Sequence, residues 1–312
     1  MISPLKTAVN AGRQAVATAQ SHANHTEGEI RLKLRYPITS ELFTFVHGLN
    51  RAVEMALRRE CDLSVVQYRA LSCMRQAGEL EEGNIAHILA VGASQLSQAL
   101  GPLAESGYVK SRTYRGPTKL WSLAAKGDRK IEAADDVLVD ACVQVFGPLG
   151  PDLGAAIRTG SMLTNQRHGV VRIEGGRFFE EHACFEAFLQ AERFTKESTE
   201  SFGLTETEFR ILFELFCKGP SSKSAIARSL VLAPSVVTDA CRSLGNRALV
   251  EQSRMPSDKR MHMLALTEQG RKLTEQAAIH VDDRAFEDLR PSSVDERALY
   301  QQMAELYVQD KR

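Results

Sequence analysis

Short polar and basic side chains gather between residues 235 and 260, and their chemistry is recognition rather than bond making. Hydroxyl and guanidinium groups at helical spacing can read the edges of nucleic-acid bases, and basic groups on a turn can neutralise phosphates. The helical set is Ser235, Thr238, Asp239 and Arg242, and the turn set is Arg254, Asp258, Lys259 and Arg260. A carboxylate such as that of Asp239 is repelled by phosphate unless it accepts a hydrogen bond from cytosine.

Start and stop signals for short helices precede these side chains. Thr205 is followed three positions later by Glu208, which is the spacing of a capping box, and Gly219 ends the helix that they begin. Ser222 can cap a second helix, and Pro234 suits the first turn of a third because its missing N–H is not needed there. Three short helices in succession are therefore predicted.

The third of these helices is predicted to have a buried face and an open face. Val237, Cys241 and Leu244 recur at helical spacing and predict the buried face, which leaves the helical polar set exposed. A turn at residues 255–258 and the alternating run Met261–Leu266 then predict a hairpin with a basic tip. Three helices followed by a hairpin make a winged helix-turn-helix, whose third helix fits the major groove of DNA.

This stretch resembles the multiple-antibiotic-resistance (MarR) family of regulators. The Leu-Thr opening at Leu204, the Asp258-Lys259-Arg260 wing and the run Leu266–Arg271 lie in that family's order and spacing. The resemblance implies that Arg260 enters the minor groove and that Asp258 fixes the hairpin. It also implies a double-stranded operator DNA as partner, and repression that is relieved by a small amphipathic effector. That effector would bind between the helical body and the head, at residues that the sequence does not identify.

The same pattern occurs earlier in the chain. The run Leu63–Leu71 aligns with Leu204–Leu212 at an offset of 141 residues, and the offset holds without a gap as far as Val109 and Val250. The first hairpin is two residues shorter than the second. One unit is therefore present twice. The predicted domains are an N-terminal extension at 1–37, a first unit at 38–168, a linker at 169–177 and a second unit at 178–312.

Longer helices flank each predicted head. Apolar residues at helical spacing predict them at 39–59, 125–145, 178–202 and 267–289. In the resembling family, such helices of two subunits interlock to form a dimer, whereas here both copies lie in one chain. The predicted fold is mainly α with small β wings, in which two winged helix-turn-helix domains are joined by a helical, dimerisation-like body. Because a short linker makes pairing intramolecular, we expect a monomer that forms an intramolecular pseudo-dimer.

The two predicted heads differ in the side chains that would meet DNA. The third helix of the first head presents no positive charge, and its hairpin lacks the Asp-x-Arg pattern. Its candidate contacts are Ser94, Gln95, Ser97 and Gln98 on the helix and Arg112, Arg115 and Lys119 on the hairpin. Basic residues crowd around this hairpin, and we expect them to bind phosphate. Because Gln can read adenine and Arg can read guanine, the two half-sites need not be inverted copies.

Charge and composition narrow the classes of protein. The 39 Lys and Arg residues equal the 39 Asp and Glu residues, so any nucleic-acid surface must be local. No apolar run approaches about 18 residues, and the six cysteines lack a Cys-x-x-Cys pair, so we expect a cytoplasmic protein without a membrane span. The sequence has no glycine-rich phosphate loop, Gly-x-Ser-x-Gly or His-Glu-x-x-His motif. We therefore expect no enzyme activity, no cofactor and no metal.

Two other functions stay open. The zero net charge and the uncharged first recognition helix allow a winged-helix module that binds protein without binding DNA. A thiol-based redox regulator would use Cys184, since peroxide-sensing members of the resembling family keep a reactive cysteine in a comparable place. The neighbouring Glu180, Glu181 and Glu186 disfavour a thiolate there. His182 with Cys184 could bind zinc only with a second pair of ligands, which is not evident in the sequence.

A single chain should therefore contain the complete two-headed body, because each copy of the repeat carries its own flanking helices. Sedimentation at micromolar concentration is expected to show mainly a monomer near 34.5 kDa. A dimer that resists dissociation would contradict this expectation and would mean that the repeats pair between chains.

Overall fold

The computed structural model describes residues 39–114, 116, 118–147, 180–255, 258–285, 304–305 and 307–309. The predicted extension at 1–37 and the predicted linker at 169–177 lie outside these ranges, as does Arg115. At Arg254 and at residues 258–260 the structure describes the backbone but not the side chains.

Two compact units make up the described chain. The first unit is Gly48–Phe188, and the second comprises the described residues on either side of that range. Helix α2 (Ser40–Cys61) starts in the second unit and ends in the first. Helix α8 (Glu180–Glu200) starts in the first unit and ends in the second. Each unit is therefore built from both halves of the sequence.

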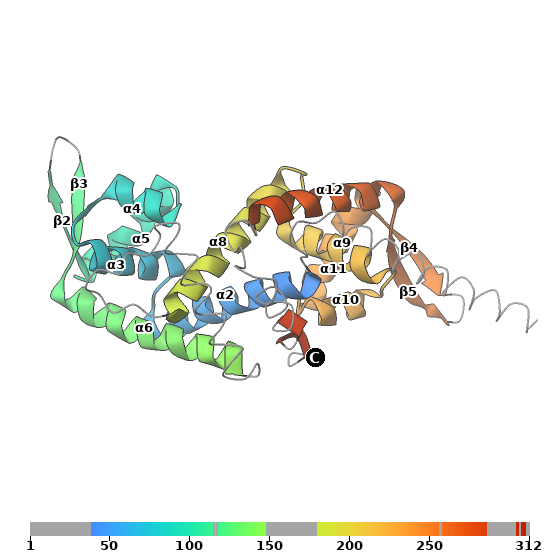
Figure 1. Ribbon diagram of the computed structural model, residues 1–312, viewed down its shortest axis with the longest axis horizontal. Helices are drawn as coiled ribbons and strands as arrows, with labels where there is room; N and C mark the ends of the chain where they lie inside the picture. The colour runs from blue at the N-terminus through green and yellow to red at the C-terminus, as the bar shows by residue number, and fades with distance from the viewer. Residues whose placement is uncertain are drawn as a thin grey trace, which may run out of the picture. The chain divides into compact units, whose positions relative to one another are not determined.

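The first unit contains a head of three short helices with a small antiparallel sheet and the long helix α6 (Figure 1). Its elements after α2 are α3 (Val65–Ala77), β1 (Leu80–Glu81), α4 (Glu82–Leu89), α5 (Ala93–Glu105), β2 (Val109–Thr113), β3 (Lys119–Leu123) and α6 (Ala125–Phe146). The strand order is β1-β3-β2, with Leu80 opposite Trp121 and Val109 opposite Leu123. Strands β2 and β3 form the predicted hairpin. Strand β1 was not predicted, because two residues are too few to show an alternating pattern.

The second unit has the same order of helices (Figure 1). Its elements after α8 are α9 (Glu206–Lys218), α10 (Lys223–Ser229), α11 (Pro234–Asn246), β4 (Val250–Met255), β5 (Asp258–Leu266) and α12 (Glu268–Ala285). Strands β4 and β5 pair antiparallel, and Ser221 makes an isolated bridge to Leu264 where the first unit has β1. No single described helix has the length and apolarity to cross a membrane, and α10 and α11, which have them only as a pair, are bent by 119°.

The element boundaries repeat with the offset seen in the sequence. Helices α3 and α9 begin at Val65 and Glu206, and helices α5 and α11 begin at Ala93 and Pro234, so each pair lies 141 residues apart. The mainly helical architecture with small antiparallel hairpins agrees with the predicted fold class.

Local hydrogen bonds confirm the predicted helix starts. The hydroxyl of Thr205 accepts from the backbone N–H of Glu208 at 3.1 Å, and the Glu208 carboxylate accepts from the N–H of Thr205 at 2.9 Å. Ser64 and Gln67 form the same capping box in the first unit. The predicted cap Ser222 accepts from a backbone N–H at 3.2 Å. These reciprocal bonds satisfy donors that the first turn of a helix otherwise leaves unpaired.

Two glycines allow a close approach of the long helix to the hairpin in both units. A Cβ at Gly127 in α6 would lie 2.0 Å from the carbonyl oxygen of Tyr108, and a Cβ at Gly270 in α12 would lie 1.9 Å from that of Leu249. A side chain at either glycine would therefore force the helix away from the segment that leads into the hairpin.

Gly127→Ala and Gly270→Ala should each lower the free energy of unfolding by about 1–3 kcal/mol, because backbone atoms must move to admit the new methyl group. Gly245→Ala is the matched control. It lies in α11 with no atom within 4 Å of its added Cβ, so better helix propensity should leave stability unchanged or raise it. Urea denaturation measures all three. Wild-type stability of the Gly127 and Gly270 variants would show that the contact is not tight.

Candidate nucleic-acid interface

Helix α11 presents an open face in the second unit. Ser235, Asp239 and Arg242 are exposed, and the predicted inner face of the helix is buried. The half-buried Thr238 donates its hydroxyl proton to the carbonyl of Pro234 at 2.8 Å. The predicted helical set therefore lies on one side of the helix, where three of its four side chains are exposed.

Arg242 already has an acidic neighbour on this face. Its guanidinium lies 2.9 Å from the carboxylate of Asp239, and the two side chains are 66% and 69% exposed. Ion pairs this exposed typically contribute less than about 1 kcal/mol, because water screens them. Arg242 can therefore exchange Asp239 for another acceptor at little cost.

The second wing is the hairpin β4-β5. Arg254 pairs with His262 across the strands, Met255 pairs with Asp258, and the register shifts between Arg254 and Met255. Lys259 and Arg260 follow Asp258 on β5. The backbone thus places all four charged wing residues in the half of the hairpin that is nearer the turn. The role of Asp258 in fixing the turn stays a prediction.

Helix α5 presents the corresponding face in the first unit. Its predicted contacts Ser94, Gln95, Ser97 and Gln98 are all exposed. Leu96, Ala99, Leu100 and Leu103 are buried on the other side. The exposed face can donate and accept hydrogen bonds but carries no charge among these four residues, so it offers base reading without attraction to phosphate.

Cations on and beside the first wing contact neighbouring groups of the first unit. Arg112 on β2 forms two hydrogen bonds to the carboxylate of Glu79, one of them with 2.7 Å between Nε and Oε1. Lys119 lies over the ring of Trp121 with Nζ 6.0 Å from the ring centre, and Lys126 donates to a backbone carbonyl at 2.9 Å. Glu79 therefore neutralises Arg112, whereas the groups that contact Lys119 and Lys126 here carry no charge. Glu79 was missed because it lies 33 residues before Arg112, outside the hairpin pattern.

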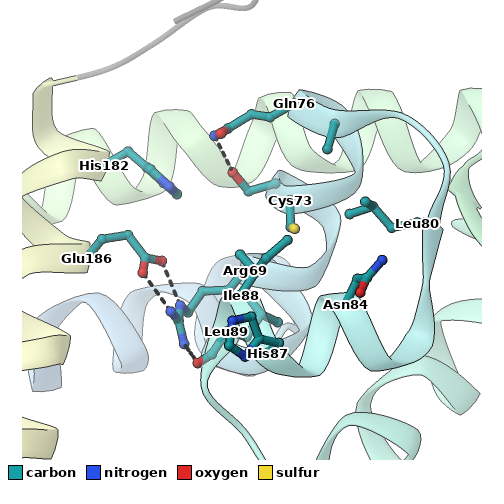
Figure 2. Close-up of a pocket in the computed structure, with 12 residues that line it drawn as sticks. Arg69, Cys73, Gln76, Leu80, Asn84, His87, Ile88, Leu89, His182 and Glu186 are labelled. Atoms are coloured by element: carbon teal, nitrogen blue, oxygen red, sulfur yellow. Dashed lines mark hydrogen bonds and ion pairs between the residues drawn. The ribbon is translucent and has the colours of Figure 1, made fainter. Parts of the chain in front are cut away.

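A cavity of about 370 Å³ opens beside α3 in the first unit (Figure 2). Its lining combines apolar and hydrogen-bonding side chains. The lining residues are Arg69, Ser72, Cys73, Gln76, Ala77, Leu80, Asn84, His87, Ile88, Leu89, His182 and Glu186. This volume and mixture are typical of sites for small organic molecules.

A bidentate ion pair closes one side of the cavity. Figure 2 shows Arg69 of α3 reaching both Glu186 of α8 and the backbone of Leu89. The guanidinium nitrogens lie 2.6 and 2.7 Å from the two oxygens of Glu186, and Nη1 donates to the Leu89 carbonyl at 2.9 Å. The Arg69 side chain is 11% exposed and that of Glu186 is 6% exposed, so both charges depend on this pairing.

A buried hydrogen-bond chain lies next to that ion pair. Tyr68 donates to Asp135 at 2.9 Å, so the hydrogen bond of 2.9 Å between its hydroxyl oxygen and His182 Nδ1 must use a proton on the histidine. Burial lowers the pKa of His182 and so favours the neutral ring, and the hydrogen bond to Tyr68 requires the proton of that ring on Nδ1. His182 and Cys184 do not form a group of metal-binding side chains within the described residues.

The second unit has an arginine in the same place with different partners. Arg210 lies 141 residues after Arg69, and its Nη2 donates to the carbonyl of Leu230 at 2.9 Å. The same nitrogen lies 3.2 Å from the hydroxyl of Thr44 on α2. Burial lowers the pKa of Arg210, which is 2% exposed. A neutral hydroxyl thus contacts this guanidinium where the first unit has the carboxylate of Glu186.

Two cysteines bear on the redox alternative. Cys184 is fully buried. Cys73 lines the cavity, and burial followed by the negative charge of Glu186 raises its pKa to about 11. Because the thiolate is the reactive form, this environment keeps Cys73 unreactive at neutral pH.

Residues 204–262 match the sequence model of the MarR family. The match runs from the Leu-Thr opening into the second wing, and it confirms the predicted resemblance for this segment, which is less than half of the chain. An uncharacterised HTH-type transcriptional regulator, YhbI of Bacillus subtilis (strain 168), is 35% identical over 80 residues, which are 26% of this chain and 52% of YhbI. The chain thus spans about half the length of this curated relative.

Solved structures also share parts of the chain. YusO from Bacillus subtilis is 25% identical with a TM-score of 0.28, over 31% of this chain and 67% of YusO. A mutant of MarR from E. coli, complexed with operator DNA, is 22% identical with a TM-score of 0.33, over 36% of this chain and 81% of that protein.

Cys73 should react with an alkylating agent only at high pH in the folded protein. Because its pKa is raised to about 11, the rate should still be rising at about pH 10. In urea the same cysteine should level off above about pH 9, since a free thiol has a pKa of about 8.5. Mass spectrometry of the Cys73 peptide measures both rates. If the rate in the folded protein levels off at about the same pH as in urea, the thiol is not desolvated.

Proposed function

We propose that this chain is a MarR-like DNA-binding transcriptional regulator, a repressor that a small-molecule effector releases from its operator. The observation that carries the proposal is the coincidence of two features at one place. The segment that matches the family, residues 204–262, is also the segment with an exposed polar recognition face on α11 and a basic hairpin after it. The operator-bound structure of MarR from E. coli is of a protein similar to this one over part of its length.

In this proposal the second unit holds DNA more firmly than the first. Arg242 on α11 reads a base edge after leaving Asp239, and Arg260 enters the minor groove beside it. In the first unit, α5 offers Gln95 and Gln98 without a positive charge, and Arg112 must leave Glu79 before it can meet a phosphate. An asymmetric operator, strong on one side and weak on the other, is the consequence.

The cavity beside Arg69 is the proposed effector site. An acidic ligand in it competes with Glu186 for the guanidinium, and apolar neighbours such as Ile88 and Leu80 receive its hydrocarbon part. A ligand that displaces Glu186 from Arg69 would release α8 from α3 within the first unit. The ligand would then contact Arg69 only in the state in which Glu186 has been displaced. A ligand can shift a protein between two states only through such a difference in contacts.

The repeated boundaries of α3 and α9 and of α5 and α11 support the proposal of two tandem winged helices in one chain. The sharing of α2 and α8 between the units supports an intramolecular pseudo-dimer. A protein-interaction module is the second candidate, favoured by the neutral face of α5 and by the Glu79–Arg112 pair. Fully buried Cys184 and the raised pKa of Cys73 oppose a thiol-based regulator.

Arg260→Ala should weaken binding to the DNA upstream of the protein's own coding sequence by roughly 5- to 150-fold, the equivalent of about 1–3 kcal/mol for a base contact. Arg51→Ala removes the same charge from the exposed surface of α2 and should change affinity little. Fluorescence anisotropy over a salt series measures both, and wild-type affinity should fall steeply with salt. Equal affinity of Arg260→Ala and wild type would remove the wing assignment. Weak, salt-independent binding of the wild type would favour the interaction module.

A further inference from the structure

Three side chains with metal-binding atoms meet in the second unit, on three different helices. Nδ1 of His47 on α2 lies 2.9 Å from Oε1 of Glu192 on α8 and 4.0 Å from Oε1 of Glu206 on α9. The three ligand atoms all lie within 4.8 Å of one another. Across the part of the chain that the structure describes, this is the one group of three such side chains.

Negative charge is concentrated here in a half-buried place. The side chains of His47, Glu192 and Glu206 are 39%, 25% and 20% exposed, so an ion can reach them from solvent. Burial raises the pKa of Glu206, and repulsion by the neighbouring Glu192 raises it further. Arg210, His47 and Lys196 offset part of this repulsion.

Arg210 does not occupy the cluster. Its Nη2 donates hydrogen bonds to the hydroxyl of Thr44 and the carbonyl of Leu230. Its charge acts on Glu206 through space.

We propose that His47, Glu192 and Glu206 bind one divalent transition-metal ion, of which Zn²⁺ is the representative. Zinc lies about 2.0–2.2 Å from imidazole nitrogen and carboxylate oxygen, so neighbouring ligand atoms around it lie about 3–3.5 Å apart. The separations of 2.9 and 4.0 Å need only small side-chain movements to match. An imidazole ligand favours zinc and related ions over Mg²⁺ and Ca²⁺, which prefer oxygen alone.

The site occurs once in the chain although the unit occurs twice. At the offset of 141 residues, the counterparts of His47, Glu192 and Glu206 are Phe188, Arg51 and Val65. None of these three can bind a metal ion, so the expected ratio is one ion per chain. The ion would join α2, α8 and α9, and it would stabilise the folded second unit because the unfolded chain has no preformed site.

Calorimetric titration of Zn²⁺ into the full-length reduced chain tests the proposal. We expect one ion per chain, and at least tenfold weaker binding for both His47→Ala and Glu206→Gln. The matched control is Glu197→Gln, which removes a carboxylate from the exposed surface of α8 and should bind like the wild type. Circular dichroism checks that each variant is folded, and Glu206→Gln keeps the shape of the side chain that it replaces.

A second measurement separates this site from the six cysteines. Co²⁺ bound at the cluster should give visible absorption without the charge-transfer band that a thiolate ligand produces. The proposal would be overturned by a thiolate band or by a stoichiometry other than one ion per chain. Wild-type affinity in both His47→Ala and Glu206→Gln would also overturn it. None of these readouts depends on DNA, so they remain decisive even where the proposed operator binding fails.

Discussion

Each unit buries an arginine that completes the end of the next helix. Arg69 donates to the carbonyl of Leu89 at the end of α4, and Arg210 donates to that of Leu230 at the end of α10, both at 2.9 Å. The last carbonyls of a helix have no partner within it, and they form the negative end of its dipole. The buried guanidinium donates a hydrogen bond to such a carbonyl, and its positive charge lies at the negative end of the dipole. It thereby ties the end of α4 to α3 and the end of α10 to α9.

A buried guanidinium needs more than one carbonyl, and the two units meet this need in different ways. In the first unit, Glu186 supplies both carboxylate oxygens to Arg69. In the second, Thr44 supplies a neutral hydroxyl, and the negative charge that balances Arg210 comes from Glu206 and Glu192 at a greater distance. One oxygen of Glu192 and one of Glu206 lie 2.9 and 4.0 Å from Nδ1 of His47. The proposed effector site therefore lies beside Arg69 and its carboxylate partner, and the proposed metal site lies near Arg210.

Surface charge is also tuned by single acidic residues. Asp239 lies beside Arg242 on α11, and Glu79 holds Arg112 on the first wing with two hydrogen bonds. Exposed pairs of this kind are weak in water, but each must open before its arginine can meet a phosphate or a base. In a chain with no net charge, such local pairs decide which part of the surface attracts a polyanion.

The sequence by itself determined the helix boundaries, the inward and outward faces of α11, and the repetition of the unit. Thr205 with Glu208, Ser222, and Pro234 act on backbone groups within four positions, so their effect can be read without the fold. Helical spacing likewise reports which side of a single helix is buried. The second wing and the family match could also be found from the sequence, because each depends on residues that are close together in the chain.

Only the tertiary structure decided which distant side chains meet. Arg69 and Glu186 are 117 residues apart, and His47 and Glu192 are 145 residues apart. These pairs exist because α2 and α8 each pass from one unit into the other, so the start of each helix packs with the head from the opposite half of the sequence. No local pattern specifies that exchange, because it is set by how complementary faces pack once the helices have formed.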